Sequence, residues 1–238
     1  MNTQTVLPAQ EEGPILHPRR NIPIFIRRDP LKRAFDILFS LAVLIFTSPL
    51  FLILTLFVRC SSKGPIFFKD RRLGRGGEMI DCYKFRTMHP NAQDRLIELL
   101  KTNAVLQTEW NTFRKIKLDP RITPIGRFLR RTSLDELPQF WNVLKGDLSV
   151  VGPRPPTLLS SPDQFLEEIK AIYGDKAPII LSVRPGITGV WQTSGRSKIS
   201  SQQKAAMEAS YAETRTFLQD LILIFKTIPA VLLSRGAQ

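Results

Sequence analysis

The feature that most constrains the fold is a long apolar run near the start of the chain. From Ile37 to Val58 there is no charged residue, and Leu, Ile, Phe and Val dominate. A helix of about 20 apolar residues is long enough to cross a bilayer. A run this long and this apolar is not typical of a buried helix in a soluble protein. It therefore predicts a segment that enters a membrane.

A Ser-Pro pair interrupts this run near its middle. Pro49 has no backbone N–H and its ring clashes with the carbonyl four residues earlier, so the helix should kink there. The hydroxyl of Ser48 can bond a carbonyl that the proline leaves free, which makes a break tolerable in lipid. Ser48 and Pro49 together predict a helix, a break and a second helix.

Basic residues flank both ends of the run, and they favour keeping both ends on the cytoplasmic side. They are Arg27, Arg28, Lys32 and Arg33 before it and Arg59, Lys63, Lys69, Arg71 and Arg72 after it. We expect residues 31–60 to form a re-entrant membrane helix, with a kinked single span as the alternative. Residues 1–30 are expected to be a mobile, basic, Pro-rich tail that becomes a membrane-facing collar near Lys32 and Arg33.

The charge of the chain indicates anionic partners. Its formal net charge is +13 and its pI is near 10.2, which suits phospholipid head groups, nucleotide phosphates or nucleic acid. Cys60 and Cys82 stand in no metal-binding or redox spacing, so we expect a reduced, cytoplasm-facing protein. His17 and His89 are isolated and predict no histidine-based metal site.

The rest of the chain, residues 61–238, predicts a mostly helical α+β domain. The strand-like segments 66–68 and 79–85 flank a glycine-rich turn at 74–77, which indicates a small hairpin. Helical spacing of apolar residues covers 91–106, 163–173 and 201–217. The last apolar stretch, 218–233, contains Asp220, Lys226 and Pro229. We expect it to be an amphipathic helix lying at the membrane interface.

The stretch 130–156 carries the strongest indication of chemistry. Adjacent carboxylates, Asp135 and Glu136, lie between Arg130-Arg131 and a Gly-Pro-Arg-Pro loop that contains Arg154. Carboxylates surrounded by guanidinium groups suit a site for a metal ion and a phosphate. The alternative is a capping box at residues 133–136. In either case a helix should begin near Asp135, lower the pKa of that carboxyl group, and end at the Lys-Gly pair 145–146.

Further cations could contact phosphate. Lys84 and Arg86 alternate with aromatic residues, so on a strand they would share one face, either as a phosphate-contacting pair or simply in solvent. The proline-rich loop 152–156 should hold Arg154 on a stiff support. The segment 183–196, with Arg184 and Arg196, predicts a structured binding loop.

Several motifs along the chain together resemble one protein family. In chain order they are Lys32-Arg33-x-Phe35-Asp36, the Ser48-Pro49 break, Tyr83-Lys84-Phe85-Arg86-Thr87-Met88, Ser133-Leu-Asp-Glu-Leu-Pro-Gln139, Asn142-Val-Leu-Lys-Gly-Asp147, Val151-Gly-Pro-Arg-Pro155, Val183-Arg-Pro-Gly-Ile-Thr-Gly189 and Ser194-Gly-Arg196. From about Lys32 to Gly236 the chain resembles the bacterial sugar transferases, the monotopic phosphoglycosyl transferases that begin lipid-linked glycan assembly.

The resemblance implies a reaction. A nucleoside diphosphate sugar, expected to be UDP-linked, would bind with Mg²⁺ at Asp135 and Glu136, and Asp135 would attack the sugar-bearing phosphate. Glu136 would help to hold the metal or would handle a proton. Undecaprenyl phosphate would then take the sugar phosphate from the aspartyl intermediate, at the cytoplasmic face of the bacterial inner membrane. This would be the first membrane step of exopolysaccharide, capsule or O-antigen synthesis. The expected phosphate-binding residues are Lys84, Arg86, Arg130, Arg154, Arg184 and Arg196.

Composition alone also permits a membrane-anchored basic scaffold that binds anionic lipid or nucleic acid. Such a scaffold would spread its cations along exposed faces, whereas here they gather around Asp135 and Glu136. Interleaving of aromatic and basic residues, which is typical of nucleic-acid binding, is sparse. We therefore expect an enzyme that has inner-membrane phospholipid, but no nucleic acid, among its partners.

Overall fold

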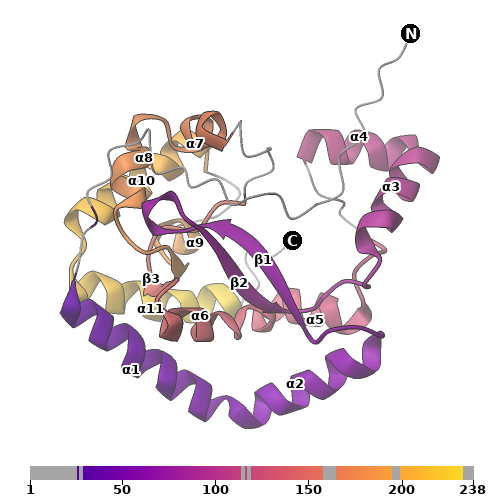
Figure 1. Cartoon of the computed structure of the whole chain (residues 1–238), viewed down its shortest axis with the longest axis horizontal. Helices are drawn as coiled ribbons and strands as arrows, with labels where there is room; N and C mark the ends of the chain where they lie inside the picture. Colours follow the sequence, from indigo (N-terminus) through magenta and orange to yellow (C-terminus); the bar gives the residue numbers. More distant parts are fainter. Residues whose placement is uncertain are drawn as a thin grey trace.

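The computed structural model describes residue 26 and residues 29–113, 116, 119–157, 165–194 and 199–232. Most of the expected N-terminal tail, Arg27 and Arg28, and Arg196 lie outside the described residues. The described part is mostly helical with two small sheets. This agrees with the predicted α+β class (Figure 1).

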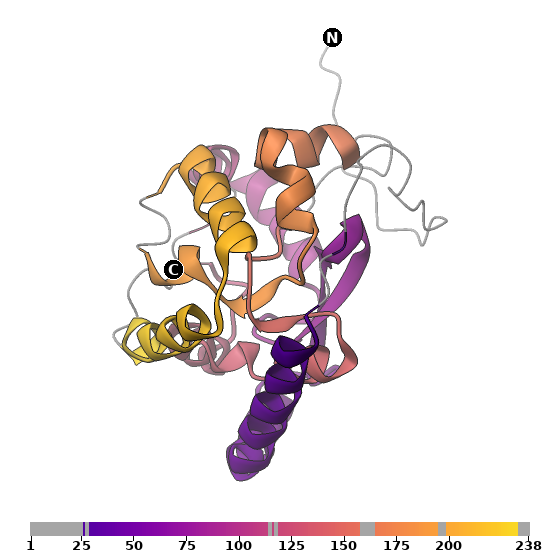
Figure 2. The ribbon, with the colours of Figure 1, turned by 90° about the vertical axis from the view of Figure 1, so that its left-hand side faces the viewer.

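The apolar run forms two helices, α1 (Pro30–Phe46) and α2 (Ser48–Ser61), bent by 64°. The hydroxyl of Ser48 donates to the carbonyl of Ile45 at 2.8 Å. This is the carbonyl that the missing N–H of Pro49 leaves free. The predicted break is confirmed. The two helices form a wide V along one side of the body in Figure 1, and they project from it in Figure 2.

Within the described ranges, no single helix has both the length and the hydrophobicity needed to cross a bilayer. The bent pair of α1 and α2 meets both requirements only when its two helices are taken together.

The predicted hairpin is present as an antiparallel sheet. Strand β1 (Phe67–Leu73) pairs with β2 (Met79–Phe85), with Phe67 opposite Phe85 and Leu73 opposite Met79. The turn between them contains a short 3₁₀ segment, η2 (Arg75–Gly77), in which two glycines adopt positive φ. These left-handed conformations are readily accessible only to glycine.

A second, parallel sheet joins β3 (Ser149–Val151) to β4 (Gly186–Thr188). The backbones approach so closely that a Cβ atom on Gly152 or on Gly186 would collide with the backbone of the other segment. The segment 183–196 is thus not one binding loop. It contains β4 and the short helix α9 (Val190–Thr193), and most of the residues from Val183 to Gly189 are buried.

The remaining helices follow the predicted pattern with shifted bounds. The expected helix at 91–106 is two helices, α3 (Ala92–Thr102) and α4 (Ala104–Phe113). Asn103 separates them, and its side chain accepts hydrogen bonds from the backbone N–H groups of Val105 and Leu106. The others are α5 (Pro124–Thr132), α6 (Gln139–Lys145), α7 (Phe165–Tyr173), α8 (Ala177–Leu181), α10 (Ser201–Thr214) and α11 (Phe217–Leu232), with 3₁₀ turns η3 (Leu134–Glu136) and η5 (Gly174–Lys176).

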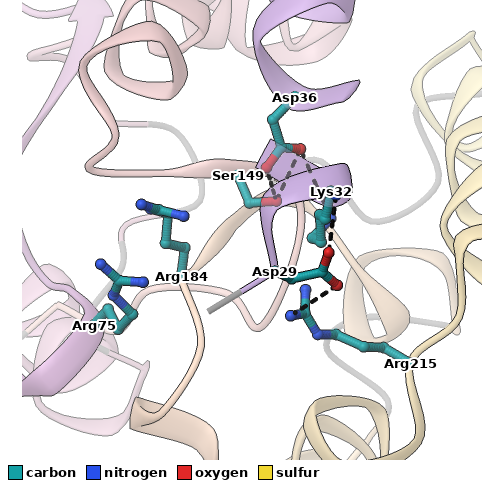
Figure 3. A pocket seen from close by; sticks show the side chains of 7 residues that line it. All are labelled: Asp29, Lys32, Asp36, Arg75, Ser149, Arg184 and Arg215. Atoms are coloured by element: carbon teal, nitrogen blue, oxygen red, sulfur yellow. Dashed lines mark hydrogen bonds and ion pairs between the residues drawn. The ribbon is translucent and has the colours of Figure 1, made fainter. Parts of the chain in front are cut away.

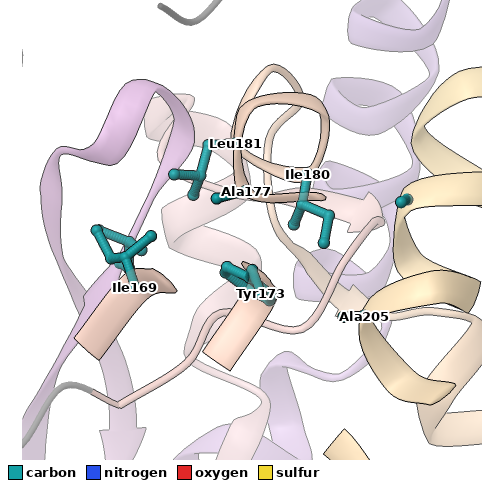
Figure 4. Packing of buried hydrophobic residues seen from close by; sticks show 8 residues of the cluster. Ile169, Tyr173, Ala177, Ile180, Leu181 and Ala205 are labelled. Atoms are coloured by element: carbon teal, nitrogen blue, oxygen red, sulfur yellow. The ribbon is translucent and has the colours of Figure 1, made fainter. Parts of the chain in front are cut away.

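Three hydrophobic clusters hold these elements together. One joins the end of β1 at Leu73 to α7, α8 and α10 (Figure 4). A second packs β2, α6 and β3 against Tyr211 and Leu223 of the last two helices. The third packs Leu54 and Val58 of α2 against Phe85 and Leu129. Leu134 and Leu137 also pack against it, so the third cluster anchors the second half of the bent pair beside the turn that carries Asp135 and Glu136, here called the carboxylate turn.

The start of α1 is fixed to the body by polar contacts. The Lys32 ammonium group donates to Asp220 of α11 at 2.7 Å. Buried Asp36 accepts hydrogen bonds from the Ser149 hydroxyl and from the N–H of Val150. Arg33 donates to two carbonyls at the C-terminal end of α6, where the helix dipole favours a cation. Both side chains are therefore bonded to the body of the protein, and the membrane-facing collar near Lys32 and Arg33 stays a prediction.

Candidate active site

The turn that carries both carboxylates depends on how α5 begins and ends. The Thr123 side chain accepts from the N–H of Gly126 at 3.0 Å and caps the helix. A Cβ atom on Gly126 would collide with the backbone of Thr87, so α5 lies directly against the segment after β2. At the other end Ser133 adopts a left-handed conformation, with φ 55°. The chain thereby turns sharply out of α5 and into η3.

The capping-box alternative is not what the structure shows. The Ser133 side chain makes no capping hydrogen bond. The next α-helix, α6, begins at Gln139 after Pro138 instead of near Asp135. Its predicted end is confirmed, since Gly146 follows Lys145 with φ 95°. Asp135 and Glu136 therefore occupy a tight turn between two helices, and neither is needed to cap the longer one.

Glu136 is the centre of an ion-pair network. Its Oε1 atom lies 3.2 Å from Arg154 Nη2 and 3.6 Å from Lys84 Nζ. Burial alone would raise the pKa of Glu136, but Arg154 and Lys84 outweigh that effect and hold the pKa below its ordinary value of 4.5. This carboxylate is therefore a fixed negative charge that orients two cations.

The adjacent Asp135 has a different environment. Burial, followed by the neighbouring charge of Glu136, raises the pKa of Asp135 from 3.8 to about 6, against the opposing effects of Lys84 and Arg130. The prediction that a helix start would lower this pKa is wrong, because no α-helix begins here. The pKa values of two adjacent carboxyl groups are thus shifted in opposite directions. Such divergence is characteristic of sites in which the two groups perform different tasks.

Strand β1 contributes Asp70 and Arg72, neither of which the sequence analysis assigned to the site. Lys84 also pairs with Asp70 at 3.0 Å, and Asp70 pairs with Arg72 at 2.5 Å. Phe68 lies opposite Lys84 in the hairpin, so Asp70 occupies the diagonal position on the same sheet face. The alternation of Asp70 and Arg72 along one strand was the available signal, but it becomes meaningful only with the hairpin register.

Arg130 approaches the site from α5. Its Nε donates to the Thr87 hydroxyl at 2.9 Å. Burial lowers the pKa of this guanidinium, while the nearby charges of Asp135 and Asp119 oppose that shift. The protein thus holds a partly desolvated cation close to Asp135.

Arg154 is held at both its backbone and its side chain. Its N–H donates at 3.0 Å to Glu208, whose side chain is fully buried in α10. Its guanidinium lies over the ring of Trp191 and bonds Glu136. The next residue, Pro155, accepts a hydrogen bond from Arg72. The loop therefore supplies the stiff support expected for Arg154, and Glu208 is a further residue that the sequence did not reveal.

The other predicted phosphate ligands are elsewhere. The Arg86 guanidinium bonds carbonyl groups of Pro65, Val58 and Ser62 at the end of α2. Phosphate binding by Arg86 would require these bonds to break, so Lys84 and Arg86 are not one phosphate-contacting pair. Arg184 donates to the carbonyl of Gly146, and its charged neighbours are Arg75, Arg33 and Asp36, not the carboxylate pair. Arg196 lies outside the described residues.

The site offers a limited donor set for a metal ion. In the described ranges, no group of three or more His, Cys, Asp or Glu side chains could hold a metal ion. Asp135 and Glu136 supply carboxylate oxygens, and Mg²⁺ is often bound by only one or two carboxylates together with substrate phosphates. The donor chemistry therefore fits Mg²⁺ that arrives with a phosphorylated substrate.

Known proteins resemble this chain over nearly its whole length. A family described as "Bacterial sugar transferase" matches residues 27–234. The exopolysaccharide production protein ExoY of Sinorhizobium fredii is 44% identical over 206 residues, which is 87% of each chain. The undecaprenyl-phosphate galactose phosphotransferase of Salmonella typhimurium is 43% identical over 207 residues, which cover 87% of this chain but 41% of that protein. The UDP-galactose-lipid carrier transferase of Erwinia amylovora is 39% identical over an equal length.

These similarities include the whole described site, from the bent helix pair to α11. The chain is thus an enzyme, and the alternative of a basic scaffold without catalysis is not supported. The predicted family is confirmed: the chain belongs to the bacterial sugar transferases.

Proposed function

We propose that this protein transfers a sugar phosphate from a nucleoside diphosphate sugar to undecaprenyl phosphate, through an intermediate on Asp135. The observation that carries the proposal is the pair of unlike carboxyl groups. Glu136 is fixed by Arg154 and Lys84, whereas Asp135 has a pKa of about 6 beside Arg130. One carboxylate thus organises the cations, and its neighbour is available to react.

In the first step, a carboxylate oxygen of Asp135 attacks the phosphorus atom that bears the sugar. The bond from that phosphorus to the bridging oxygen breaks, and nucleoside monophosphate leaves with the electron pair. With a pKa of about 6, roughly nine-tenths of Asp135 is ionised at pH 7. Lys84, Arg130 and Arg154 would face the oxygens on which negative charge develops.

In the second step, an oxygen of undecaprenyl phosphate attacks the same phosphorus atom. The bond to Asp135 breaks, and the carboxylate is regenerated. Splitting the transfer in this way replaces one difficult step by two easier ones. Because the pKa of Glu136 is lowered, this group is better suited to orient cations than to donate a proton.

Mg²⁺ would be held by Asp135 and Glu136 together with the diphosphate of the donor, and it would supply charge neutralisation at that diphosphate. Side chains of the protein would still position the cations of the site. Glu208 and Trp191 hold Arg154 in place, and Asp70 holds Lys84.

Exposed apolar side chains support a membrane location for the site. Large hydrophobic residues project outward from α1, α2 and α11; they are Leu38, Leu41, Ile45, Phe46, Leu52, Ile53, Leu56, Phe57, Phe217, Leu218, Ile222, Phe225 and Ile228. Exposed apolar surface of this extent marks a membrane or partner interface. We propose that the V of α1 and α2 enters one leaflet from the cytoplasmic face of the inner membrane, with α11 at the interface. The head group of undecaprenyl phosphate would then meet the site without its chain leaving the lipid.

The decisive experiment measures release of nucleoside monophosphate by detergent-solubilised full-length protein with undecaprenyl phosphate and Mg²⁺. UDP-galactose is the first donor to test, since two of the relatives carry galactose in their names, and UDP-glucose is the second. Asp135→Asn should abolish release. Asp175→Asn, at a side chain that is 85% exposed, is the matched control.

The intermediate can be tested separately. Without the lipid acceptor, wild-type protein incubated with donor labelled in the sugar should retain label after denaturation, and Asp135→Asn should retain none. Equal label on both proteins would reject Asp135 as the attacking group. Absence of release with any donor, from protein that unfolds cooperatively, would reject the proposed reaction.

A further inference from the structure

An exposed aromatic side chain lies directly beside the cations of the carboxylate turn. Phe68 of β1 is 55% exposed, and the hairpin register places it opposite Lys84 of β2. Opposite residues of an antiparallel pair project from the same face of the sheet, with Cβ atoms about 5 Å apart. Lys84 in turn pairs with Glu136 and Asp70. Phe68 is therefore an apolar neighbour of a cation in the candidate active site.

The rest of this sheet face is covered by the protein. The side chains on it are those of Phe68, Asp70, Arg72, Ile80, Cys82 and Lys84. Only Phe68 among them is exposed, and the others are buried or half-buried. Within the described ranges Phe68 belongs to none of the three hydrophobic clusters. Packing inside the protein therefore does not explain an aromatic residue at this position.

The end of the hairpin that carries Phe68 and Lys84 is attached to α2. On the opposite sheet face, the ring centroid of Phe67 lies 5.9 Å from that of Phe51 in α2. Arg86, which follows β2, donates to carbonyl groups at the end of α2. From this attachment the hairpin extends away from the V, toward α8 (Figure 1). Phe68 and Lys84 are thus at the end of the hairpin nearest to α2.

The other arm of the V is attached to the body as well. In α1, Asp36 accepts from the Ser149 hydroxyl and lies 3.7 Å from Lys32 Nζ (Figure 3). Both arms are thus attached to the body from which the hairpin projects. In the proposed membrane placement, the end of the hairpin with Phe68 is therefore the part of it nearest to the lipid.

We propose that Phe68 contacts the isoprenoid chain of the acceptor next to its phosphate, while that phosphate meets Lys84. The inference rests on the proposed function, since it concerns the second of the two proposed steps. The acceptor joins an anionic head directly to an apolar chain, and the hairpin presents a cation directly beside an apolar ring. Contact between ring and chain removes apolar surface of both from water. The donor has no such chain, so Phe68 determines specificity for the acceptor alone.

The test separates the two steps by loading the protein first. Full-length protein in a non-ionic detergent is incubated with sugar-labelled donor, and the label is then discharged with increasing undecaprenyl phosphate or farnesyl phosphate, a shorter isoprenoid phosphate. Phe68→Ala should retain as much label as the wild type, but it should need about ten times more of either acceptor for half-maximal discharge. The maximal rate should change little. Phe68→Leu keeps an apolar side chain and should behave nearly as the wild type does.

Two further variants provide the comparison. Trp141→Ala removes a ring from α6 that is 56% exposed, and it should need no more acceptor than the wild type does. Phe57→Ala removes a ring that is 55% exposed on α2, in the surface proposed to face the membrane. An equal loss in Phe57→Ala and Phe68→Ala would assign the effect to that surface in general and overturn the inference.

The remaining outcomes distinguish this inference from the proposed function. Discharge of Phe68→Ala at the acceptor concentrations that suffice for the wild type would overturn the inference and leave the proposed function intact. Reduced labelling by the donor in both Phe68→Ala and Phe68→Leu would also overturn it, because the ring would then act before the acceptor binds. Absence of label on the wild type with any donor would reject the proposed function and this inference together.

Discussion

Replacing Asp135 by Asn should make the protein more stable while it abolishes turnover. The reason is the environment of the carboxyl group, in which burial and the charge of Glu136 raise its pKa from 3.8 to about 6. An ionised Asp135 is therefore unfavourable in the folded protein at neutral pH. Asn has nearly the same shape and carries no charge, so it relieves that penalty.

The size of the effect follows from the pKa shift. A change of about two pKa units corresponds to at most about 3 kcal/mol. Because Asp135 is only partly buried by accessible surface, solvent screening reduces this figure, and we expect about 1.5 kcal/mol. For a chain of this length that difference corresponds to a rise in Tm of about 3–6 °C.

The pH dependence of stability is the most specific test of this explanation. Between pH 3.8 and about 6 the folded protein binds a proton at Asp135 that the unfolded chain releases. The contribution of Asp135 to the stability of the wild type should therefore fall as pH rises through this window and then level off. Asp135→Asn lacks the titration, so its advantage should be small near the lower limit and fully developed by about pH 7.

Thermal unfolding of both proteins across this pH range, in one detergent, provides the measurement. The control is Glu136→Gln, for which a change in the opposite direction is expected. Arg154 and Lys84 lower the pKa of Glu136, so the charge of Glu136 stabilises the fold at neutral pH. Loss of that charge should reduce Tm. A lower Tm for Asp135→Asn than for the wild type at neutral pH would refute the reasoning. A difference in Tm between the two proteins that stays constant between pH 3.8 and about 6 would refute it as well.

Three further outcomes follow from the site and its supports. Below about pH 6 the kcat/KM for donor should fall about tenfold per pH unit, because the proposed attack needs an ionised Asp135. A flat profile of nucleoside monophosphate release from pH 5 to 8 would contradict this. Glu208→Ala should lower kcat about tenfold by releasing the loop of Arg154. Glu208→Gln keeps an acceptor for the N–H of Arg154 and should retain most activity. Equal kcat values for the two variants would argue against a role of Glu208 in positioning Arg154. Asp36→Ala should destabilise the protein by about 2–4 kcal/mol through loss of its buried hydrogen bonds. Asp175→Ala, at an exposed side chain, should change stability by less than about 0.5 kcal/mol. Similar losses of unfolding free energy for the two variants in denaturant titrations would refute this expectation.

Local chemistry made parts of this fold predictable from sequence. The break at Ser48-Pro49 follows from a missing N–H and a nearby hydroxyl, and the structure forms that bond to Ile45. The hairpin follows from alternating residues around a glycine turn, and the end of α6 follows from Lys145-Gly146. The same local reasoning failed at Ser133. There the residue adopts a left-handed conformation at the end of α5 and makes no capping bond, which the motif at 133–136 does not predict.

Contacts between residues that are far apart in the chain were harder to predict from the sequence. Asp70 joins Lys84 only because the hairpin register places them diagonally. Glu208 supports Arg154 from a helix that begins beyond the β3–β4 sheet. Arg86 and Arg184 were expected at the site because their residue type suits phosphate. Their actual partners are backbone carbonyls near the ends of α2 and α6. Residue type indicated the chemistry, but three-dimensional packing decided which cations could perform it.

Contacts of α1 and α2 with the body link the bent helix pair to the carboxylate turn. Lys32, Arg33 and Asp36 bond α1 to α11, α6 and β3. At the other end of the pair, Leu54 and Val58 pack against Leu129 of α5, the helix that leads into Asp135. Both arms of the V therefore contact elements that hold the carboxylate turn, whereas its apex at Phe46 is 83% exposed. A membrane that accepts the apex would thus fix the depth of the carboxylate turn through these two attachments, as the proposed transfer to a lipid-bound phosphate requires.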